Sequence, residues 1–370
     1  MTYNPHTPSS TMHFQNAILA PLAGVSDIPF RRVCQDLGAE LTYIEMLSAT
    51  AICYNNEKTF EMMEVHPTEK QVGVQITSRN AEEMGRAAQA VQGRGFHSID
   101  INMGCPVKKV VKVGCGSAIL KDPQRVYDTT YQACLASDIP VSVKIRLGWD
   151  HSCTNWSEVA DAAIRGGAAW ITIHGRTRSD TYASPVQLGE IYKAAEQLSI
   201  PVIGNGNLFH LEDVQLMQQK GGVAGVMISR GALGNPWLFR DVVHNKVQPV
   251  TPEEWQKVVL QHIRYQEEYF TQKNLLSVGS VCMRKHLIWY LSGWPGAKPF
   301  KQRVNTATCF SEFTEITQQF TERLIEAHVP ARQVAQPQLS QQDPSSWDPK
   351  FEMDRKLDRG VSQIGYEPGL

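Results

Sequence analysis

The sequence lacks any apolar run long enough to cross a membrane. A membrane-spanning helix needs about 20 consecutive apolar residues, and no stretch of the 370-residue chain approaches that length. The first 15 residues are polar and include Pro5 and Pro8, so no secretory signal peptide is predicted. We therefore expect a cytoplasmic protein that has no membrane partner.

Paired cysteines and clustered metal ligands are also missing. The eight cysteines show neither CxxC pairs nor zinc-ligand spacing, which predicts reduced thiols rather than a disulfide framework. The eleven histidines are spread widely and form no dense cluster with acidic residues. This distribution disfavours a metal-dependent barrel hydrolase, and no metal is expected.

An excess of charge of one sign is absent as well. The chain carries 36 Lys and Arg against 37 Asp and Glu, and 42% of its residues are hydrophobic. Nucleic-acid binding depends on clustered cations that neutralise phosphates. Any nucleic-acid surface must therefore be a local patch on an otherwise balanced globular protein.

Eight short apolar runs that alternate with helical patterns dominate residues 17–245. The predicted strands cover 17–22, 41–46, 71–77, 98–103, 140–146, 170–174, 201–205 and 225–229. Asp27, Asn80 and Asp122 stand where helices between them begin, as expected of N-capping residues. Eight strand–helix repeats predict an α/β fold, a closed parallel (β/α)8 TIM barrel. A doubly wound open sheet is the alternative, but it usually has fewer strands, and no GxGxxG motif follows the first run.

The pattern changes after the barrel. Residues 250–328 contain no convincing strand but four helical stretches, so we predict a smaller all-helical domain there. Residues 329–370 are rich in Gln, Ser, Asp and Pro and poor in aliphatic residues, which predicts a flexible C-terminal tail. Residues 1–16 are interpreted as an N-terminal extension.

Polar side chains recur on one face of the middle strands. Residues two apart share a face of a strand, and Gln75, Asn102, Lys144 and His174 all lie opposite apolar neighbours. In a barrel this polar face points inward, where buried polar groups need a polar ligand or hydrogen bonds to one another. The pattern allows two outcomes. These residues form a binding site at the carboxyl mouth of the barrel, or they only form hydrogen bonds with one another.

Glycine-bearing loops follow the last two predicted strands. Residues 204–207 read Gly-Asn-Gly-Asn, and residues 229–231 read Ser-Arg-Gly. In parallel barrels the loops after strands seven and eight often bind phosphate through backbone N–H groups. We expect a phosphate site there, with positive charge from Arg230.

A cysteine follows directly after the fourth predicted strand. The strand runs through Asn102 into Gly104, Cys105 and Pro106, and a lysine-rich segment comes next. Gly104 permits unusual backbone angles, and Pro106 stops the strand. The junction therefore places a thiol and an amide at the end of the strand where α/β proteins bind ligands. A solvated loop cysteine between two breakers is the alternative.

Together these segments resemble the dihydrouridine synthase family, most of all its bacterial B type: flavoenzymes that reduce uridines in tRNA. The most specific match is Asn102-Met103-Gly104-Cys105-Pro106. Further matches are Ala20-Pro21-Leu22-Ala23-Gly24-Val25, Val74-Gln75-Ile76, Gly116-Ser117-Ala118-Ile119-Leu120, Val143-Lys144-Ile145-Arg146-Leu147-Gly148-Trp149, Ile173-His174-Gly175-Arg176-Thr177-Arg178, Gly204-Asn205-Gly206, Arg230-Gly231-Ala232 and Arg284-Lys285-His286-Leu287-Ile288-Trp289-Tyr290-Leu291. The resemblance covers residues 17–325. Asn207 and Ser229 depart from it, because the family commonly has Asp and Gly at these places.

The resemblance implies FMN as cofactor, NADPH as reductant and tRNA as partner. The residues that would hold FMN are Pro21, Leu22, Ala23, Gln75, Lys144, His174, Asn205, Gly206, Asn207, Ser229 and Arg230. Asn102 and Arg178 would contact the target uracil, while Lys108 and Lys109 would contact tRNA phosphates. A basic face on the helical domain is expected from Arg264, Arg284, Lys285, Lys298, Lys301 and Arg303.

The resemblance also implies the chemistry. Hydride from reduced flavin would reach C6 of the uracil, and Cys105 would protonate C5 as the general acid. An unperturbed thiol has a pKa of about 8.5, so it is mostly protonated at neutral pH, which suits a donor. An FMN-dependent ene reductase or dihydroorotate dehydrogenase-like enzyme acting on a small molecule is the alternative. A non-catalytic tRNA-binding protein is a second alternative. We expect a monomer.

Overall fold

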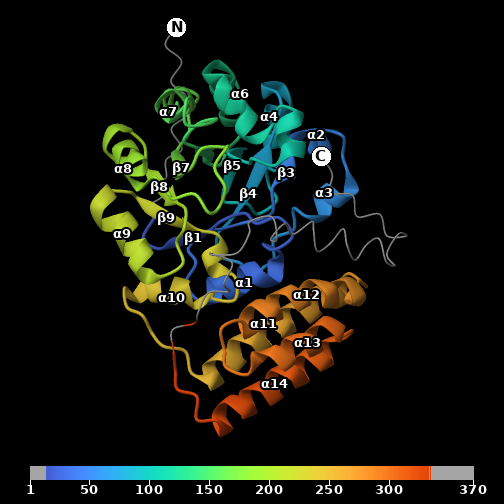
Figure 1. The fold of residues 1–370 in the computed structure, drawn as a ribbon. Coiled ribbons are helices and arrows are strands. Elements are labelled where there is room, and N and C mark those ends of the chain that lie inside the picture. The colour runs from blue at the N-terminus through green and yellow to red at the C-terminus, as the bar shows by residue number, and fades with distance from the viewer. Residues whose placement is uncertain (1–13, 333, 335–370) are drawn as a thin grey trace.

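The computed structural model describes residues 14–332 and Val334, and these residues contain a closed parallel barrel (Figure 1). The strands are β1 (Ala17–Leu19), β2 (Thr42–Tyr43), β3 (Leu47–Ser48), β4 (Val72–Thr77), β5 (Ser98–Met103), β6 (Val141–Arg146), β7 (Trp170–His174), β8 (Val202–Asn205) and β9 (Gly225–Ile228). Every pairing is parallel, and β1 pairs with both β2 and β9, while β2 also pairs with β4. The predicted TIM barrel is confirmed.

The second barrel position is occupied by two short strands instead of the single strand predicted at 41–46. Both β2 and β3 pair with β4, so they are two pieces of one barrel strand. Between them the chain leaves the regular register, and the carboxylate of Glu45 accepts a hydrogen bond from the backbone N–H of Gly24. The strand is interrupted where Glu45 turns toward the loop after β1, a contact that no local pattern predicts.

Helices cover the outside of the barrel (Figure 1). The helices of this part of the chain are α1 (Ile28–Asp36), α2 (Ala49–Cys53), α3 (Glu57–Glu61), α4 (Ala81–Ala90), α5 (Lys108–Lys112), α6 (Pro123–Leu135), α7 (Trp156–Arg165), α8 (Leu188–Gln197), α9 (Leu211–Gly221) and α10 (Trp237–His244). The 3-10 turns η1 (Gly116–Lys121) and η2 (Arg230–Ala232) lie in the connections after β5 and β9. The carboxylates of Asp27 and Asp122 and the amide of Asn80 accept the backbone N–H three residues on, as N-caps do. Among the described helices, none combines the length and apolar composition that crossing a bilayer requires.

The barrel interior is apolar at one end and polar at the other. Trp170 and Tyr43 are fully buried in a small core inside the barrel, near the amino ends of the strands. The ring of Phe14 packs against Trp170 with centroids 5.3 Å apart and closes this end. Phe14 belongs to the expected N-terminal extension, and residues 1–13 lie outside the described residues. Gln75, Asn102, Lys144, His174 and Asn205 lie toward the carboxyl ends of β4 to β8 and line a cavity there. The four of them on β4 to β7 are on the inward face that the period-two pattern predicts.

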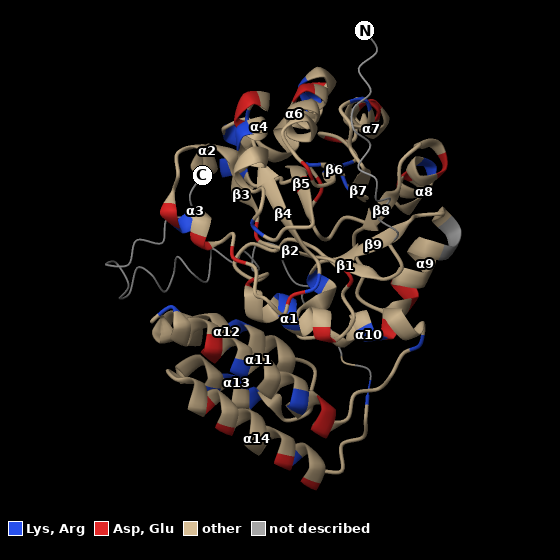
Figure 2. Cartoon of the chain, turned by 180° about the vertical axis from the view of Figure 1, so that it is seen from behind, with Lys and Arg blue, Asp and Glu red and all other residues tan. Residues whose placement is uncertain are grey.

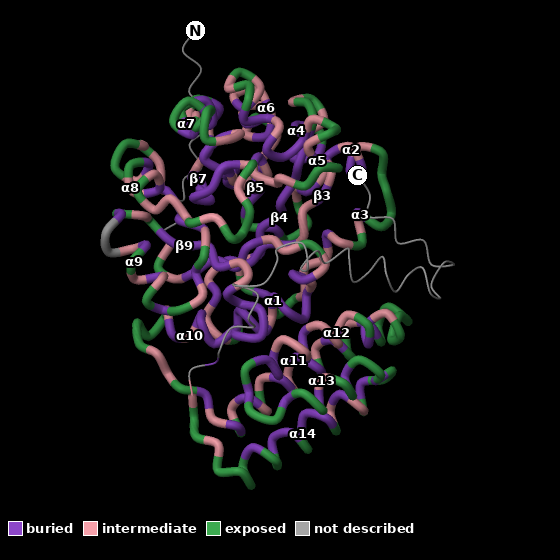
Figure 3. Tube along the Cα trace, viewed as in Figure 1, coloured by how far each residue is buried: buried purple, intermediate pink, exposed green. Residues whose placement is uncertain are grey.

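Four helices after the barrel have a core of their own. They are α11 (Pro252–Gln272), α12 (Leu276–Leu291), α13 (Ala297–Thr306) and α14 (Phe310–Glu326). Trp255, Met283 and Phe313 are among the buried residues of this core. Buried and exposed residues alternate along α14, as expected of a helix that packs on one face (Figure 3). The helices meet the barrel where α11 lies beside α1 (Figure 1).

The expected flexible tail is packed at its first residues. The backbone of Arg332 pairs with that of Val250 in an antiparallel bridge, and Val334 is buried in the core of the four helices. Val329 packs against the same core. These apolar contacts hold the first part of the 329–370 segment, whereas residue 333 and residues 335–370 lie outside the described part of the chain.

Gly73 provides a test of the crowded barrel interior. A Cβ atom at this position would lie 2.8 Å from Ser98 Oγ and closer still to the ring of Tyr43. We predict that Gly73→Ala lowers the free energy of unfolding by about 1–3 kcal/mol, because the neighbours are packed. Urea denaturation of both proteins measures the difference.

Gly189 supplies the matched control. It lies in α8, and a Cβ there would meet nothing within 4 Å. Gly189→Ala should leave stability unchanged or raise it by about 0.5–1 kcal/mol, since alanine favours helix. Equal stability changes for the two variants would contradict the packing argument.

Candidate functional site

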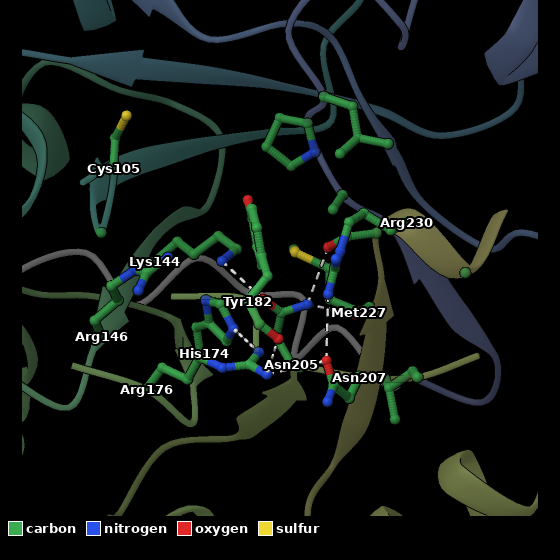
Figure 4. A pocket seen from close by; sticks show the side chains of 18 of the residues that line it. Cys105, Lys144, Arg146, His174, Arg176, Tyr182, Asn205, Asn207, Met227 and Arg230 are labelled. Atoms are coloured by element: carbon green, nitrogen blue, oxygen red, sulfur yellow. Dashed lines mark hydrogen bonds between the residues drawn. The ribbon is translucent and has the colours of Figure 1, made fainter. Parts of the chain in front are cut away.

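A cavity of about 170 Å³ opens at the carboxyl ends of the strands (Figure 4). We call it the mouth cavity. The predicted site residues that line it are Pro21, Leu22, Gln75, Asn102, Cys105, Lys144, His174, Asn205, Gly206, Asn207, Ser229 and Arg230. They come from five strands and from the loops after β1, β5, β8 and β9. Residues far apart in sequence therefore meet at one site because parallel barrel strands all end on the same side.

Four predicted site residues do not line the mouth cavity. Ala23 is exposed beyond Leu22, and Lys108 and Lys109 are exposed on α5. Arg178 lies over the ring of Trp149, with its guanidinium carbon 4.3 Å from the ring centroid. The structure thus brings together the residues predicted on strand ends, and it places the four from loops and α5 outside the lining.

The floor of the mouth cavity is a chain of buried hydrogen bonds that begins at Asp100. Gln75 Nε2 and Ser142 Oγ each donate to the Asp100 carboxylate over 2.7 Å. Asn102 Nδ2 in turn donates to Gln75 Oε1 over 2.9 Å. Burial raises the pKa of Asp100 to about 6, against the lowering effect of the two hydrogen bonds. The inward residues Gln75, Asp100 and Asn102 therefore satisfy one another, and Gln75 and Asn102 also line the cavity.

Asn102 also fixes the backbone that carries the cysteine. Its Oδ1 accepts from the backbone N–H of Gly104 at 3.2 Å and of Cys105 at 2.9 Å. The carbonyl oxygen of Cys105 accepts from the backbone N–H and the hydroxyl of Ser117, at 3.0 and 2.9 Å. Both polar backbone groups of Cys105 are thus held, and its half-buried side chain lines the mouth cavity.

Lys144 on β6 and Asn205 on β8 are linked past the intervening strand β7. Lys144 Nζ donates to Asn205 Oδ1 over 3.0 Å (Figure 4). Asn205 Nδ2 donates to the Met227 carbonyl oxygen over 2.7 Å. Burial lowers the pKa of Lys144 to about 8, although the Asp100 carboxylate works in the opposite direction. Lys144 is therefore a cation at neutral pH whose proton is lost more easily than that of an exposed lysine.

His174 is a neutral imidazole. Burial lowers its pKa well below the usual value, and the neighbouring cations Arg146 and Lys144 lower it further. Arg176 Nη1 lies 3.2 Å from His174 Nε2 (Figure 4). A guanidinium only donates, so Nε2 accepts and the proton of the neutral ring is on Nδ1.

Arginine side chains that the predicted site omits complete the cavity wall. Arg146 and Arg176 line it, and Arg176 Nη2 donates to the Tyr182 carbonyl oxygen at 3.0 Å and to Asn207 Oδ1 at 3.2 Å. The alternating strand pattern already pointed both arginines inward, so this signal was present in the sequence. Tyr182 also lines the cavity, with the guanidinium carbon of Arg230 4.0 Å from its ring centroid. The sequence around Tyr182 contains no pattern that predicts its place in the cavity wall.

The mouth cavity is cationic. Lys144, Arg146, Arg176 and Arg230 all contribute to its lining, and no carboxylate does among the described residues. Burial lowers the pKa values of all four cations, so each would gain from a bound anion. The arrangement fits an anionic ligand, with a thiol at one edge of the cavity.

A second polar cluster lies between the barrel and the four helices. Among the described residues, Asp27, His262 and His286 have ligand-type atoms within 4.8 Å of one another. Both Asp27 oxygens already accept hydrogen bonds, from Phe30 N and Gln266 Nε2. Burial raises the pKa of Asp27, and the nearby Lys285 ammonium opposes this rise. We therefore interpret the cluster as a polar joint between the two parts of the chain rather than as a metal centre.

Comparison with known proteins gives one consistent result. The family model described as Dihydrouridine synthase matches residues 18–326. The tRNA-dihydrouridine synthase B of Pseudomonas putida is 36% identical over 296 residues, which cover 78% of this chain and 86% of that protein. That of Pasteurella multocida is 37% identical over 295 residues, 78% of this chain and 88% of that protein. A probable tRNA-dihydrouridine synthase 1 of Synechocystis is 35% identical over 302 residues, 80% of this chain and 83% of that protein.

Removing the Asn102 amide should loosen the cysteine loop. Asn102→Ala removes the acceptor of two backbone N–H groups, each bond being worth about 1 kcal/mol. We predict that alkylation of Cys105 then becomes about three- to tenfold faster, as measured by peptide mass spectrometry. Exposed Cys153 in the same molecule is the internal reference.

Asn102→Asp keeps an acceptor for the two N–H groups but loses the donor to Gln75 Oε1 and adds negative charge near the thiol. Its Cys105 should therefore be alkylated more slowly than that of Asn102→Ala, because the loop stays tied and the nearby charge disfavours the thiolate. If Asn102→Ala leaves the ratio of Cys105 to Cys153 alkylation unchanged, the two backbone hydrogen bonds do not position the thiol.

Proposed function

Since the chain belongs to the dihydrouridine synthase family, we propose that it reduces a uridine of tRNA to 5,6-dihydrouridine, with FMN in the mouth cavity and NADPH as the reductant. The observation that carries this proposal is the cationic mouth cavity with the thiol of Cys105 at its edge. A cytoplasmic enzyme is part of the proposal, because tRNA is its substrate, and we retain the expected monomer as a proposal.

The donor set of the mouth cavity fits FMN. The flavin phosphate is a dianion, and Arg176 and Arg230 meet at Asn207 Oδ1, beside the glycine-bearing loop after β8. Gly231 packs so closely on Leu208 that a side chain there would strike its carbonyl oxygen. A phosphate would therefore meet guanidinium groups and backbone from the loops after β8 and β9. Asn205, Gly206 and Ser229 belong to the same end of the cavity.

Lys144, His174 and Gln75 would surround the flavin ring. When bound and reduced, FMN supplies the hydride that adds to C6 of the uracil. Lys144 carries the positive charge that favours an anionic reduced ring. His174 offers the Nδ1–H donor that its tautomer leaves available, and Pro21 and Leu22 form the apolar wall.

Cys105 would complete the reduction by protonating the substrate. Hydride addition at C6 leaves negative charge at C5 and O4, and the Sγ–H of Cys105 would donate its proton to C5. The thiol can do so reproducibly because both polar groups of its backbone are fixed. Cys115 is buried behind this loop, and burial raises the pKa of its thiol. It has no place in this step.

The target base must leave its stack to reach the mouth cavity, and the surrounding cations would hold the RNA. Asn102 and Arg178 are the proposed uracil contacts, and Lys108 and Lys109 are exposed for phosphates. Basic and acidic residues are interspersed over the four helices (Figure 2). Of the six basic residues expected to form a face there, Arg284, Lys285 and Lys301 are half-buried and donate hydrogen bonds within the protein. The exposed Arg264 and Arg303 donate to the side chains of Gln261 and Gln319. The exposed remainder, Arg264, Lys298 and Arg303, are the proposed RNA contacts.

A small-molecule ene reductase or dihydroorotate dehydrogenase-like enzyme is less well supported. The family match continues through α11 to α14, which a small substrate would not require. We therefore retain tRNA as the proposed substrate.

Cys105→Ala tests the proton donor. We predict that the variant still binds FMN and is bleached by NADPH, because the thiol is not needed for flavin reduction. It should form dihydrouridine on tRNA at least about 100-fold more slowly, the usual contribution of a general acid. Anaerobic flavin absorbance follows the first half-reaction, and mass spectrometry of digested tRNA follows the second.

The matched control is Cys115→Ala, which should stay active in both assays. Loss of both half-reactions in Cys105→Ala would show that Cys105 is structural. A colourless wild-type protein that takes up no FMN would overturn the proposed function.

Lys144 should make FMN binding depend on pH. Its pKa of about 8 means that it loses its charge above pH 8, whereas a bound anion would raise that pKa. The affinity for FMN should therefore be highest below pH 8 and fall by up to about tenfold per pH unit above it. Fluorescence titrations at several pH values between about 7 and 9.5, the range in which Lys144 titrates, measure the affinity for FMN. Lys144→Met should bind more weakly and show a flatter profile, and an equally steep profile would contradict the assignment.

A further inference from the structure

The loop after β1 forms one wall of the mouth cavity. We call residues 20–26 the Gly24 loop. Pro21 and Leu22 line the cavity, and Leu22 is tied to the end of the loop by hydrogen bonds to Ser26. Gly24 is at the turn, in the left-handed region with a φ of 68°. Because the turn is tight, a displacement of Gly24 also displaces Leu22.

Two side chains of opposite charge hold the peptide groups of Gly24. The Glu45 carboxylate accepts its backbone N–H, and the Lys285 ammonium donates to its carbonyl oxygen. Glu45 lies in the interruption between β2 and β3, and Lys285 lies on α12. Burial raises the pKa of Glu45, and the Gly24 hydrogen bond and the Lys285 charge lower it. Opposite charges on the two sides of one residue thus fix the position of the loop.

The four helices contact α1 and the loop before it at several places, and the Lys285 contact differs from the others in the residue that it reaches. Tyr265 donates to Asp36, Gln266 donates to Asp27, and Arg32 pairs with Glu268, so all of these reach α1 or its N-cap. Among the described hydrogen bonds, that of Lys285 alone reaches the Gly24 loop from the helices. The link joins residues 261 positions apart.

From this geometry we propose that Lys285 is a positioning residue for the flavin. Through Gly24, and together with Glu45, it sets where Pro21 and Leu22 stand against the flavin ring. The helical part of the chain thereby takes part in building the cofactor site. This inference depends on the proposed function, because it requires FMN in the mouth cavity.

The test compares FMN affinity and the visible spectrum of bound flavin in full-length variants. Lys285→Met removes the ammonium but keeps a chain of similar length, and it should weaken FMN binding about tenfold, since a charge-assisted hydrogen bond is lost. The flavin absorbance bands should shift as well. Lys285→Arg should restore the wild-type spectrum and affinity to within about twofold, because it can still donate.

Two further variants separate positioning from folding. Lys257 is exposed on α11, so Lys257→Met should change neither the affinity nor the spectrum. Glu45→Gln acts on the same peptide from the barrel side and should weaken FMN binding in the same direction. If both groups act through Gly24, the double variant should bind little more weakly than Lys285→Met.

The possible outcomes are distinct. If Lys285→Met lowers the melting temperature but leaves FMN affinity and spectrum unchanged, Lys285 is only structural and the inference is overturned. If Lys285→Met does not fold, Glu45→Gln decides in the same way. A wild-type protein that binds no FMN would overturn the proposed function itself. This result is seen with the wild-type protein alone, so it is distinguishable from failure of the inference about Lys285.

Discussion

The buried carboxylate of Asp100 determines the direction of every hydrogen bond in the floor of the mouth cavity. An ionised carboxylate only accepts, so Gln75 must present its NH₂ group to Asp100 and its oxygen to Asn102. Asn102 must then present its own NH₂ to Gln75, which leaves its oxygen for the backbone of Cys105. The orientation of two amides and the position of the thiol thus follow from one charge. Burying that charge is tolerable only because Gln75 and Ser142 both donate to it.

Charge is layered along the barrel axis. Asp100 lies in the floor, Lys144 and Arg146 lie on the next strand over, and Arg176 and Arg230 form the outer wall of the cavity. The Asp100 carboxylate is already hydrogen-bonded, and no carboxylate among the described residues lines the cavity, although Asp180 acts on Arg146 and Arg176 from outside the lining. Burial, assisted by the excess of cations, lowers the pKa of His174 and keeps it neutral, so the site offers an imidazole donor beside the cations. This combination suits an anionic ligand with a polar ring, which is why the proposed FMN fits without a further group.

The two parts of the chain have separate cores but share a polar joint. Asp27, His262 and His286 are packed together there, and the ring of His286 lies against that of Phe30 with centroids 5.0 Å apart. Burial lowers the pKa of His262 to about 3, so the imidazoles are neutral and add no charge to the joint. The Lys285 charge is therefore directed toward Gly24 and the nearby carboxylates. The helices that are proposed to hold the RNA are in this way joined mechanically to the wall of the proposed cofactor site.

The barrel and its polar floor follow from the order of the residues alone. Strand alternation is a local property, so a period of two is enough to direct Gln75, Asn102, Lys144 and His174 inward, and capping residues such as Asn80 mark where helices start. Packing in three dimensions set the interruption at Glu45, the entry of Tyr182 into the cavity wall and the exclusion of Arg178 from it. It also set the contact between Lys285 and Gly24. Periodicity constrains a residue relative to its neighbours in the chain, whereas loop positions and contacts across hundreds of residues depend on how complete elements pack.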